Sequence, residues 1–427
     1  MKKNTKDKNI EWVVKDRICT GCAACSLVCP KECISIEENK RLGIYEAVVK
    51  AGVCDNCGAC GRVCPQVDII SRGAKDSRTF LGKHKFCFEG YAKDNDLRYM
   101  ASSGGMVTAL CKFTLEAKLA DGIISVGPIE RDPTRFEARL VTKTEEITGF
   151  AGSKYCPVPV NRILKGFIKK TDTRRYVYVG LPCHILGLRR FFSIKPEFAS
   201  KIKYVLGLFC SHAPNLNGTE FMISKHGINV KDVKGIRYRG QGWPGDMRIS
   251  SKKQDPVRLR PSYYWGRYFG NHFFTPKYCL VCDDFFGLGS DISFGDALLD
   301  KHPNETYGVN VGIARTEEGR ALLESAKENG IVAYNNIDMD EMVRAKYGNV
   351  FFKNTLFCHR KDILMGSSRS KRIPLKYRMY NRMVLFNSYL SGNRLFVWLA
   401  VRMPRFIETL YFKCLGKIKN TLTGGVL

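Results

Sequence analysis

The chain has 427 residues, of which 44% are hydrophobic and 26% charged, and its formal net charge is +28. These proportions exclude a disordered, collagenous or fibrous protein, and the length allows two or three domains. The chain also has 18 cysteines. No apolar run follows residues 1–10, so we expect no signal peptide and a cytoplasmic protein. Cysteines in that compartment stay reduced and act as metal ligands rather than as disulfides.

A cysteine motif occurs twice near the N-terminus. The pattern C-x-x-C-x-x-C-x-x-x-C-P recurs after 35 residues, with its cysteines at Cys19, Cys22, Cys25 and Cys29 and at Cys54, Cys57, Cys60 and Cys64. In bacterial ferredoxins three cysteines of such a run hold one 4Fe-4S cluster and the fourth serves the other cluster. We therefore assign one cluster to Cys19, Cys22, Cys25 and Cys64, and the second to Cys54, Cys57, Cys60 and Cys29. Zinc sites use four ligands in two pairs and explain the doubled run less well. The spacing predicts a ferredoxin-like domain over residues 1–75.

Short apolar strands then alternate with helices. The pattern predicts strands at 86–92, 122–127, 176–180, 204–209, 291–295 and 310–314, and helices at 104–118, 160–170, 184–192, 217–226 and 317–328. Such alternation is typical of an α/β region. We expect two parts of it, at 80–170 and 171–350. The fold class is therefore a multidomain α+β and α/β protein.

Four more cysteines lie near strand ends and turns of this region. They are Cys183, Cys210, Cys279 and Cys282. Four converging thiolates can hold a third 4Fe-4S cluster or a zinc ion. Cysteine is also a common core residue, so spacing alone leaves packing and metal binding equally open.

Two glycine-containing turns are candidate phosphate sites. The first, before a predicted helix, contains Ser102, Ser103, Gly104 and Gly105, and the second contains Ser153, Lys154 and Tyr155. The amides of a helix N-terminus suit a pyrophosphate, and glycine lets a ligand approach the backbone. A plain capped helix and a solvated loop lysine are the commoner explanations of these residues. No Walker A motif occurs, and the single G-x-G-x-x-G match, GQGWPG at 240–245, does not lie between a predicted strand and a predicted helix as a dinucleotide-binding turn does.

Seven motifs together are more specific than any one of them. SSGG, GSKY, GLPCHILGLRR, GLFCSH, YRGQGWPG, YCLVC and SDISFGDA follow in that order. Over roughly residues 85–340 they resemble the beta-subunit family of coenzyme F420 hydrogenases and dehydrogenases, many members of which carry a ferredoxin domain in front. The resemblance implies FAD beside a 4Fe-4S cluster, with the cluster on Cys183, Cys210, Cys279 and Cys282. It places Ser102, Ser103, Gly104, Gly105, Ser153, Lys154 and Tyr155 at the flavin, and gives Trp243 and Asp296 no role.

The implied activity is an oxidoreductase that exchanges a hydride with coenzyme F420 and single electrons with other carriers. No catalytic residue is assigned. Bacterial relatives typically read G-T-P-C-Q and D-F-W where this chain has GLPCH at 180–184 and DAL at 296–298, which leaves the electron donor open. The alternatives are a reductase of the same build in polysaccharide or pigment synthesis, and a subunit that only transfers electrons.

The positive charge is concentrated at the C-terminus. Residues 366–427 contain 12 Lys or Arg and one acidic residue. Apolar runs there are interrupted by single basic residues, which predicts amphipathic helices that either pack on the protein or lie peripherally at the inner face of a membrane. A basic surface also favours an acidic redox partner, such as a ferredoxin or a partner subunit. No motif supports nucleic-acid binding. We expect packing roles for the other cysteines, at Cys33, Cys87, Cys111, Cys156, Cys358 and Cys414.

Overall fold

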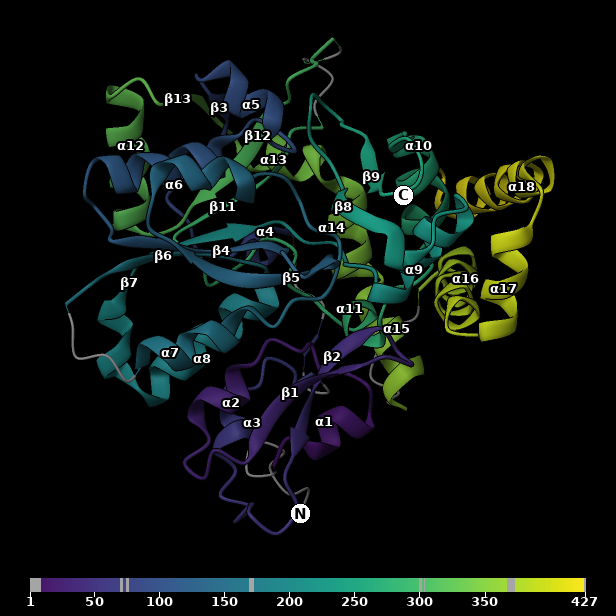
Figure 1. Cartoon of the computed structure of the whole chain (residues 1–427), viewed down its shortest axis with the longest axis horizontal. Coiled ribbons are helices and arrows are strands. Elements are labelled where there is room, and N and C mark those ends of the chain that lie inside the picture. Colours follow the sequence, from purple (N-terminus) through teal and green to yellow (C-terminus); the bar gives the residue numbers. More distant parts are fainter. Residues whose placement is uncertain are drawn as a thin grey trace.

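The computed structural model describes residues 9–69, 72–73, 77–168, 173–298, 302, 304–366 and 373–425. The N-terminal unit, drawn in purple in Figure 1, consists of short elements around a two-stranded antiparallel ladder. These are α1 (Glu11–Lys15), α2 (Ala24–Val28), β1 (Ile34–Asn39), β2 (Ile44–Val49) and α3 (Ala59–Val63). Helices α2 and α3 each begin inside a cysteine run, after a residue with positive φ, Ala23 (70°) and Gly58 (74°). The repeat in the sequence is therefore a repeat in the backbone.

An eight-stranded mixed sheet forms the centre of the molecule. Its order is β13-β3-β12-β11-β7-β6-β4-β5, and β11, β7, β6 and β4 are parallel to one another. The strands are β3 (Phe86–Ala92), β4 (Gly122–Ile129), β5 (Asp132–Val141), β6 (Tyr176–Gly180), β7 (Ile202–Leu208), β11 (Ile292–Asp296), β12 (Asn310–Ala314) and β13 (Val332–Ile337). The six predicted strands are confirmed. The sequence analysis missed β5 and β13, which form the two edges and carry more polar residues.

Helices cover both faces of this sheet (Figure 1). Helices α6 (Met106–Glu116) and α12 (Glu317–Glu328) bury Leu110 and Leu323 on one face, and α8 (Pro182–Ile194) buries Leu188 on the other. The predicted helix at 160–170 is instead the 3-10 turn η3 (Val160–Leu164) followed by α7 (Lys165–Ile168). Other helices of the region are α4 (Ser77–Leu81), α5 (Asn95–Met100), α9 (Leu216–Lys225), α10 (Pro261–Tyr263), α11 (Lys277–Leu280), α13 (Met339–Ala345) and α14 (Tyr347–Val350).

A second, smaller sheet was not predicted. It has the antiparallel order β10-β9-β8, from β8 (Val233–Arg237), β9 (Met247–Ser251) and β10 (Val257–Leu259). Shorter turns are η2 (Thr144–Phe150), η4 (Pro196–Lys201), η5 (Val230–Asp232) and η7 (Phe269–Asn271), and two π-helical turns are η6 (Tyr264–Tyr268) and η8 (Phe351–Thr355).

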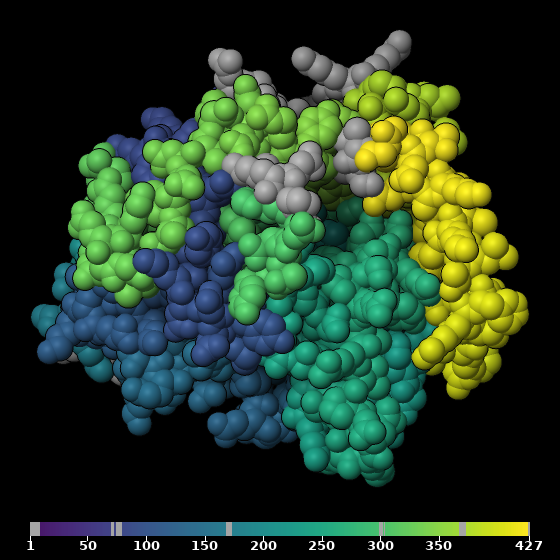
Figure 2. All heavy atoms as spheres, turned by 90° about the horizontal axis from the view of Figure 1, so that it is seen from above, coloured from purple at the N-terminus to yellow at the C-terminus, as the bar shows by residue number. Residues whose placement is uncertain are grey.

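The C-terminal residues fold into helices that pack against the central region. They are α15 (Phe357–Met365), α16 (Leu375–Ser391), α17 (Arg394–Arg402) and α18 (Arg405–Thr423), and Figure 2 shows the last of them in yellow along one side of the molecule. Tyr380 and Val384 are buried against Leu280 and Phe352. None of the helices among the described residues is both long and apolar enough to span a bilayer.

The N-terminal unit is docked firmly on the sheet region. Arg190 binds Asp68 at 2.6 Å, and Arg135 binds Glu38 at 2.8 Å. Helices α2 and α8 approach so closely that a Cβ on Gly187 would lie 2.9 Å from the Cβ of Ala24 and 3.3 Å from Sγ of Cys22. This contact brings the first cysteine run next to the start of α8.

Candidate electron-transfer site

The first ferredoxin set is gathered in the N-terminal unit. Cys25 is buried, and the charges of Cys19, Cys22 and Cys64 add to the effect of burial in raising its pKa well above the ordinary value. Cys64 interacts in the same way with Cys19 and Cys22. The structure therefore brings together the four cysteines that the sequence assigns to one cluster. Thiolates are crowded in this manner where a metal cluster compensates their charge.

The second set lies on the outer side of the N-terminal unit. Cys60 interacts with Cys54 and Cys57, and Cys57 is exposed. Cys33, which we expected to be a packing residue, lies with its Sγ 3.4 Å from Sγ of Cys29 and also interacts with Cys54. A fifth thiol therefore borders this set. Sequence spacing gave no signal for it, because Cys33 comes four residues after the last cysteine of its run.

The four single cysteines of the central region converge on one place. Cys183 interacts with Cys210, Cys279 and Cys282, and burial together with these charges raises its pKa well above the ordinary value. Cys183 begins α8 directly after β6, and Cys210 follows β7. Because β6 and β7 are parallel neighbours, their carboxyl ends meet at one edge of the sheet. Cys183 also interacts with Cys22 of the first set.

Among the described residues, no group of three or more His, Cys, Asp or Glu side chains has the geometry of a site for a single metal ion.

A buried lysine accompanies the third set and was missed in the sequence. Lys353 is 1% exposed and lies in the π-helical turn η8. It borders the same small cavity as all four cysteines and hydrogen-bonds Cys282. Burial alone would lower its pKa, but Cys282, Cys210 and Cys279 raise it above the ordinary value. The sequence feature that could have identified this lysine is its position inside the largely apolar run FFKNTLF at 351–357.

A cavity of about 660 Å³ adjoins the third set, and Cys210 forms part of its wall. Its volume is typical of a ligand-binding cavity. Among the residues expected at the flavin, the wall includes Ser102, Ser103, Gly105, Ser153, Lys154 and Tyr155. Gly104 does not line the cavity: a Cβ there would lie 2.7 Å from the backbone nitrogen of Asn310, so this glycine permits the close approach of α6 to β12.

Hydrogen bonds connect the motifs around the cavity. Ser102 Oγ accepts a hydrogen bond from the backbone nitrogen of Ser153 at 2.6 Å. Buried Arg239, which sequence analysis did not select, donates to Asp296 at 2.8 Å and to the Tyr155 hydroxyl at 3.3 Å. Burial would raise the pKa of Asp296, but the Arg239 guanidinium holds it below the ordinary value. Four motifs far apart in the sequence thus share one network.

Two features of the wall fit a bound cofactor. Trp243, one of the two matched residues without a role, lines the cavity and its buried Nε1 has no hydrogen-bond partner in the described part of the chain. Lys154 is not a solvated loop lysine: it lines the cavity, and its Nζ donates to Phe150 O and to Ala151 O. Burial lowers the pKa of Lys154 to about 7 and that of Lys346, also in the wall, to about 8. An anion in the cavity would stabilise both ammonium groups.

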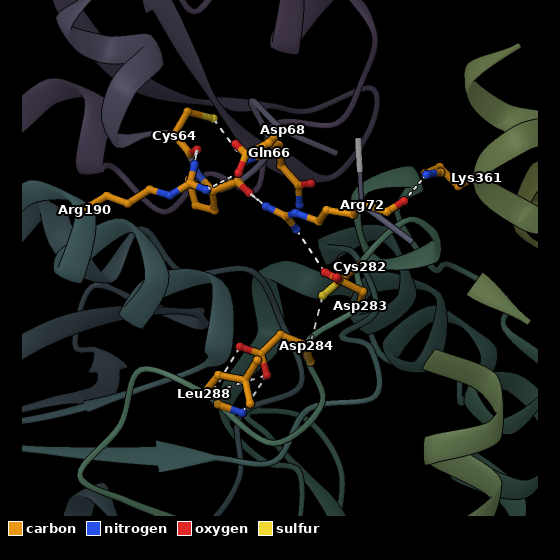
Figure 3. A network of polar contacts seen from close by, with 12 residues as sticks. Cys64, Gln66, Asp68, Arg72, Arg190, Cys282, Asp283, Asp284, Leu288 and Lys361 are labelled. Atoms are coloured by element: carbon orange, nitrogen blue, oxygen red, sulfur yellow. Dashed lines mark hydrogen bonds and ion pairs between the residues drawn. The ribbon is translucent and has the colours of Figure 1, made fainter. Parts of the chain in front are cut away.

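A polar network joins the first and third cysteine sets (Figure 3). Arg72 donates to the carbonyl of Pro65, next to Cys64, and forms an ion pair of 3.0 Å with Asp283, next to Cys282. Lys361 of α15 donates to the carbonyl of Arg72. These contacts hold the two sets in a fixed relative position.

The three cysteine sets, two of them in a ferredoxin-like domain, together with the adjoining cavity define an iron–sulfur oxidoreductase. Comparison with known families agrees. Residues 87–165 and 173–340 match the N-terminal and C-terminal parts of the coenzyme F420 hydrogenase/dehydrogenase beta subunit, and residues 18–67 match the 4Fe-4S dicluster domain. The chain belongs to the coenzyme F420 hydrogenase/dehydrogenase beta-subunit family.

Individual relatives are distant. The beta subunit of coenzyme F420 hydrogenase from Methanococcus voltae is 27% identical over 262 residues, which are 60% of this chain and 86% of that protein. Coenzyme F420-dependent sulfite reductase from Methanocaldococcus jannaschii is 26% identical over 357 residues, 79% of this chain but 50% of that protein. A chain of the F420-reducing NiFe hydrogenase complex from Methanosarcina barkeri has a similar fold, with a TM-score of 0.52 and 19% identity over 66% of this chain and 94% of that one.

Proposed function

We propose that this protein is an iron–sulfur flavoprotein that passes electrons between coenzyme F420 at FAD and one-electron carriers, through three 4Fe-4S clusters. The observation that carries the proposal is a continuous series of neighbouring cysteines from the protein surface to the cavity. Cys57, at one end of the series, is exposed, and the interaction between Cys60 and Cys25 connects the two ferredoxin sets. Cys22 lies near Cys183, and Cys210 lines the cavity.

The wall of the cavity supports FAD as its occupant. A flavin supplies the exchange between a two-electron hydride and single electrons. Ser102, Ser103, Gly105, Ser153 and Tyr155 would hold it, and Lys154 and Lys346 would balance the charge of its pyrophosphate. Gly104 would act indirectly, because it sets the position of α6. Asp296 would fix Arg239, which donates hydrogen bonds to the Ser102 carbonyl and to the Tyr155 hydroxyl and would orient both residues.

The rest of the chain would keep the carriers apart from solvent and in contact with one another. All four cysteines of the first set and Cys279 of the third are buried, which would protect the clusters from water and oxidants. The ion pairs Arg72–Asp283 and Arg190–Asp68 would hold the ferredoxin-like domain against the third cluster. Gly187 would allow the closest approach, since any side chain there meets Cys22.

Coenzyme F420 is favoured as the hydride carrier by the relatives that bear its name and by the charge of +28, which attracts an acidic, phosphate-bearing molecule. Both departures from the bacterial pattern border the cavity, at His184 and Leu298. Leu298 is 55% exposed and would contact the part of the carrier outside the flavin pocket. Further partners would be an acidic one-electron carrier or partner subunit near Cys57, and a membrane at residues 366–427.

The test is an anaerobic single-turnover experiment on the full chain reconstituted with iron, sulfide and FAD. We expect reduced F420 to bleach the flavin and then to reduce an added one-electron dye, with NADH much slower. In Cys210→Ala the flavin should still be reduced while transfer to the dye fails. Cys87→Ala, a buried cysteine of β3 outside all three sets, should behave as wild type. Flavin reduction by NADH alone would contradict the F420 assignment. A flavin-free protein that still transfers electrons would contradict the enzymatic proposal and support a purely connecting subunit.

A further inference from the structure

The C-terminal helices expose an unusual amount of apolar surface. Of the 20 large hydrophobic side chains exposed among the described residues, 12 lie in α16, α17 and α18. Several are more than half exposed, including Phe406 (74%), Leu395 (64%) and Leu410 (63%). Scattered single hydrophobic residues on a surface are normal, but a concentration of this kind marks an interaction site.

In α17 the exposed side chains form one row. Leu395, Trp398, Leu399 and Arg402 are spaced i, i+3, i+4 and i+7, which places them on one face of the helix. The guanidinium carbon of Arg402 lies 4.2 Å from the centre of the Trp398 ring. This face of α17 therefore carries both apolar side chains and a cation. The cation, the Arg402 guanidinium, packs on the Trp398 ring.

Helix α18 repeats the arrangement over a longer stretch. Phe406, Leu410, Lys413 and Lys417 recur at helical spacing along one exposed row, and Ile407, Tyr411 and Ile418 form the row beside it. Apolar residues occupy the first half of this exposed row and cations the second half, and neither row contains an acidic side chain.

The opposite faces of these helices are already occupied. Phe396 of α17 stacks on Phe273 with ring centres 6.0 Å apart, and Phe412 of α18 contacts the same ring at 6.0 Å. Glu408 is 1% exposed and pairs with buried Lys225 at 3.4 Å. The helices are thus fixed to the central region, and the exposed rows face away from it, on the side seen in yellow in Figure 2.

The charge of this surface decides what it can bind. Glu408 is the single acidic residue of 366–427, and its burial leaves the outer rows with cations and no carboxylate. A second copy of the chain would bring cations against cations, so self-association through these rows is unfavourable. A protein partner would have to bury the cations at the centre of its interface, whereas at a lipid surface long basic side chains reach the headgroups while their neighbours enter the acyl boundary.

We propose that the outer rows of α17 and α18 bind the surface of a membrane that contains anionic phospholipid. The helices would lie in the plane of the interface, with Trp398, Phe406 and Leu410 inserted and Lys413 and Lys417 at the headgroups. This binding is separate from the redox function, since no cysteine set or cavity residue belongs to these rows.

The experiment is sedimentation of the full, cofactor-loaded chain with vesicles of phosphatidylcholine alone or of an equal mixture with phosphatidylglycerol. We expect binding to the mixed vesicles at low salt, with loss at high salt. Each cation contributes about 1 kcal/mol near an anionic surface, so the double variant Lys413→Gln/Lys417→Gln should bind roughly 30-fold more weakly. Trp398→Ser should also weaken binding. The matched control Lys252→Gln/Lys253→Gln removes the same charge from the bend after β9 and should leave binding unchanged.

Iron content and flavin reduction, measured on the same preparations, should equal those of wild type in every variant. The proposal is wrong if wild-type protein sediments with neither vesicle, if it binds neutral and mixed vesicles equally, or if the two double variants lose binding equally. Because the redox readouts are independent, a failure of the proposed function would leave this result interpretable.

Discussion

Lys353 offers the most direct test of the third cluster. Its ammonium is 1% exposed and hydrogen-bonds Cys282, so it should stabilise the more negative, reduced form of a cluster bound there. Two unit charges 4 Å apart interact by about 4 kcal/mol at an effective dielectric constant of about 20. The added electron is spread over the whole cluster and lies farther away, so we take roughly half of that value, about 2 kcal/mol. For a one-electron couple this corresponds to about 90 mV.

We therefore expect Lys353→Met to lower the midpoint potential of one of the three clusters by about 90 mV, while Lys353→Arg keeps it near the wild-type value. Electron paramagnetic resonance during an anaerobic redox titration measures this. Lys346→Met is the matched control, because Lys346 is buried at the cavity beside Asp296 and not at the cysteines. An upward shift, no shift, or the same shift in the control would refute the reasoning. Loss of the cluster signal only in Lys353→Met, with Lys353→Arg intact, would show that the charge is required for assembly.

Further predictions concern the cofactors and the C-terminal helices. Cys279→Ser should lower the iron content from about twelve to about eight per chain with the ferredoxin clusters retained; twelve irons in this variant would remove Cys279 from the ligand set. Cys57→Ser should leave FAD bound and reducible but stop electron export, because a hydroxyl is a poor ligand for iron in a cluster; unchanged export would place the exit elsewhere. Burial lowers the pKa of Lys154 to about 7, so the ammonium is lost as pH rises above 7 and FAD affinity should fall by up to about tenfold per pH unit. Fluorescence titration measures this, and a slope that persists in Lys154→Met would assign it to another group. Glu408→Gln leaves a buried cation unpaired and should destabilise helix docking by about 3–5 kcal/mol, which limited proteolysis detects, and deletion of 366–427 should expose apolar surface and cause aggregation. A monomeric, soluble truncation would contradict the packing seen here.

The eight ferredoxin cysteines and most elements of the central region could be predicted from local sequence. The spacing of Cys19, Cys22 and Cys25 allows few arrangements other than three corners of one cluster, because the intervening chain is too short to separate them. Buried strands such as β6 and β12 are buried at every position and largely apolar, which made them visible as runs. Edge strands β5 and β13 were missed because one side of such a strand is solvated and its residues resemble those of loops.

That the turns at 102–105 and 153–155 lie at the same cavity was expected only through family resemblance. Ser102 and Ser153 are 51 residues apart, and their hydrogen bond exists because α6 and the turn at 151–155 meet over the same end of the sheet. Arg239, which joins Ser102 and Tyr155 to Asp296, had no local signal, since an arginine in a glycine-rich turn is ordinary in sequence.

What the sequence by itself determined is the chemistry that acts over short distances along the chain: the doubled cysteine run, the apolar strands and the excess of positive charge at the C-terminus. Only the tertiary structure decided which distant groups meet. It brought Cys183, Cys210, Cys279 and Cys282 together with Lys353, placed Cys33 against Cys29, and buried Glu408 so that the outer rows of α17 and α18 carry cations without carboxylates. The physical reason is that short spacing constrains geometry through the covalent backbone, whereas contacts between distant residues depend on how strands order in the sheet and how helices dock on it.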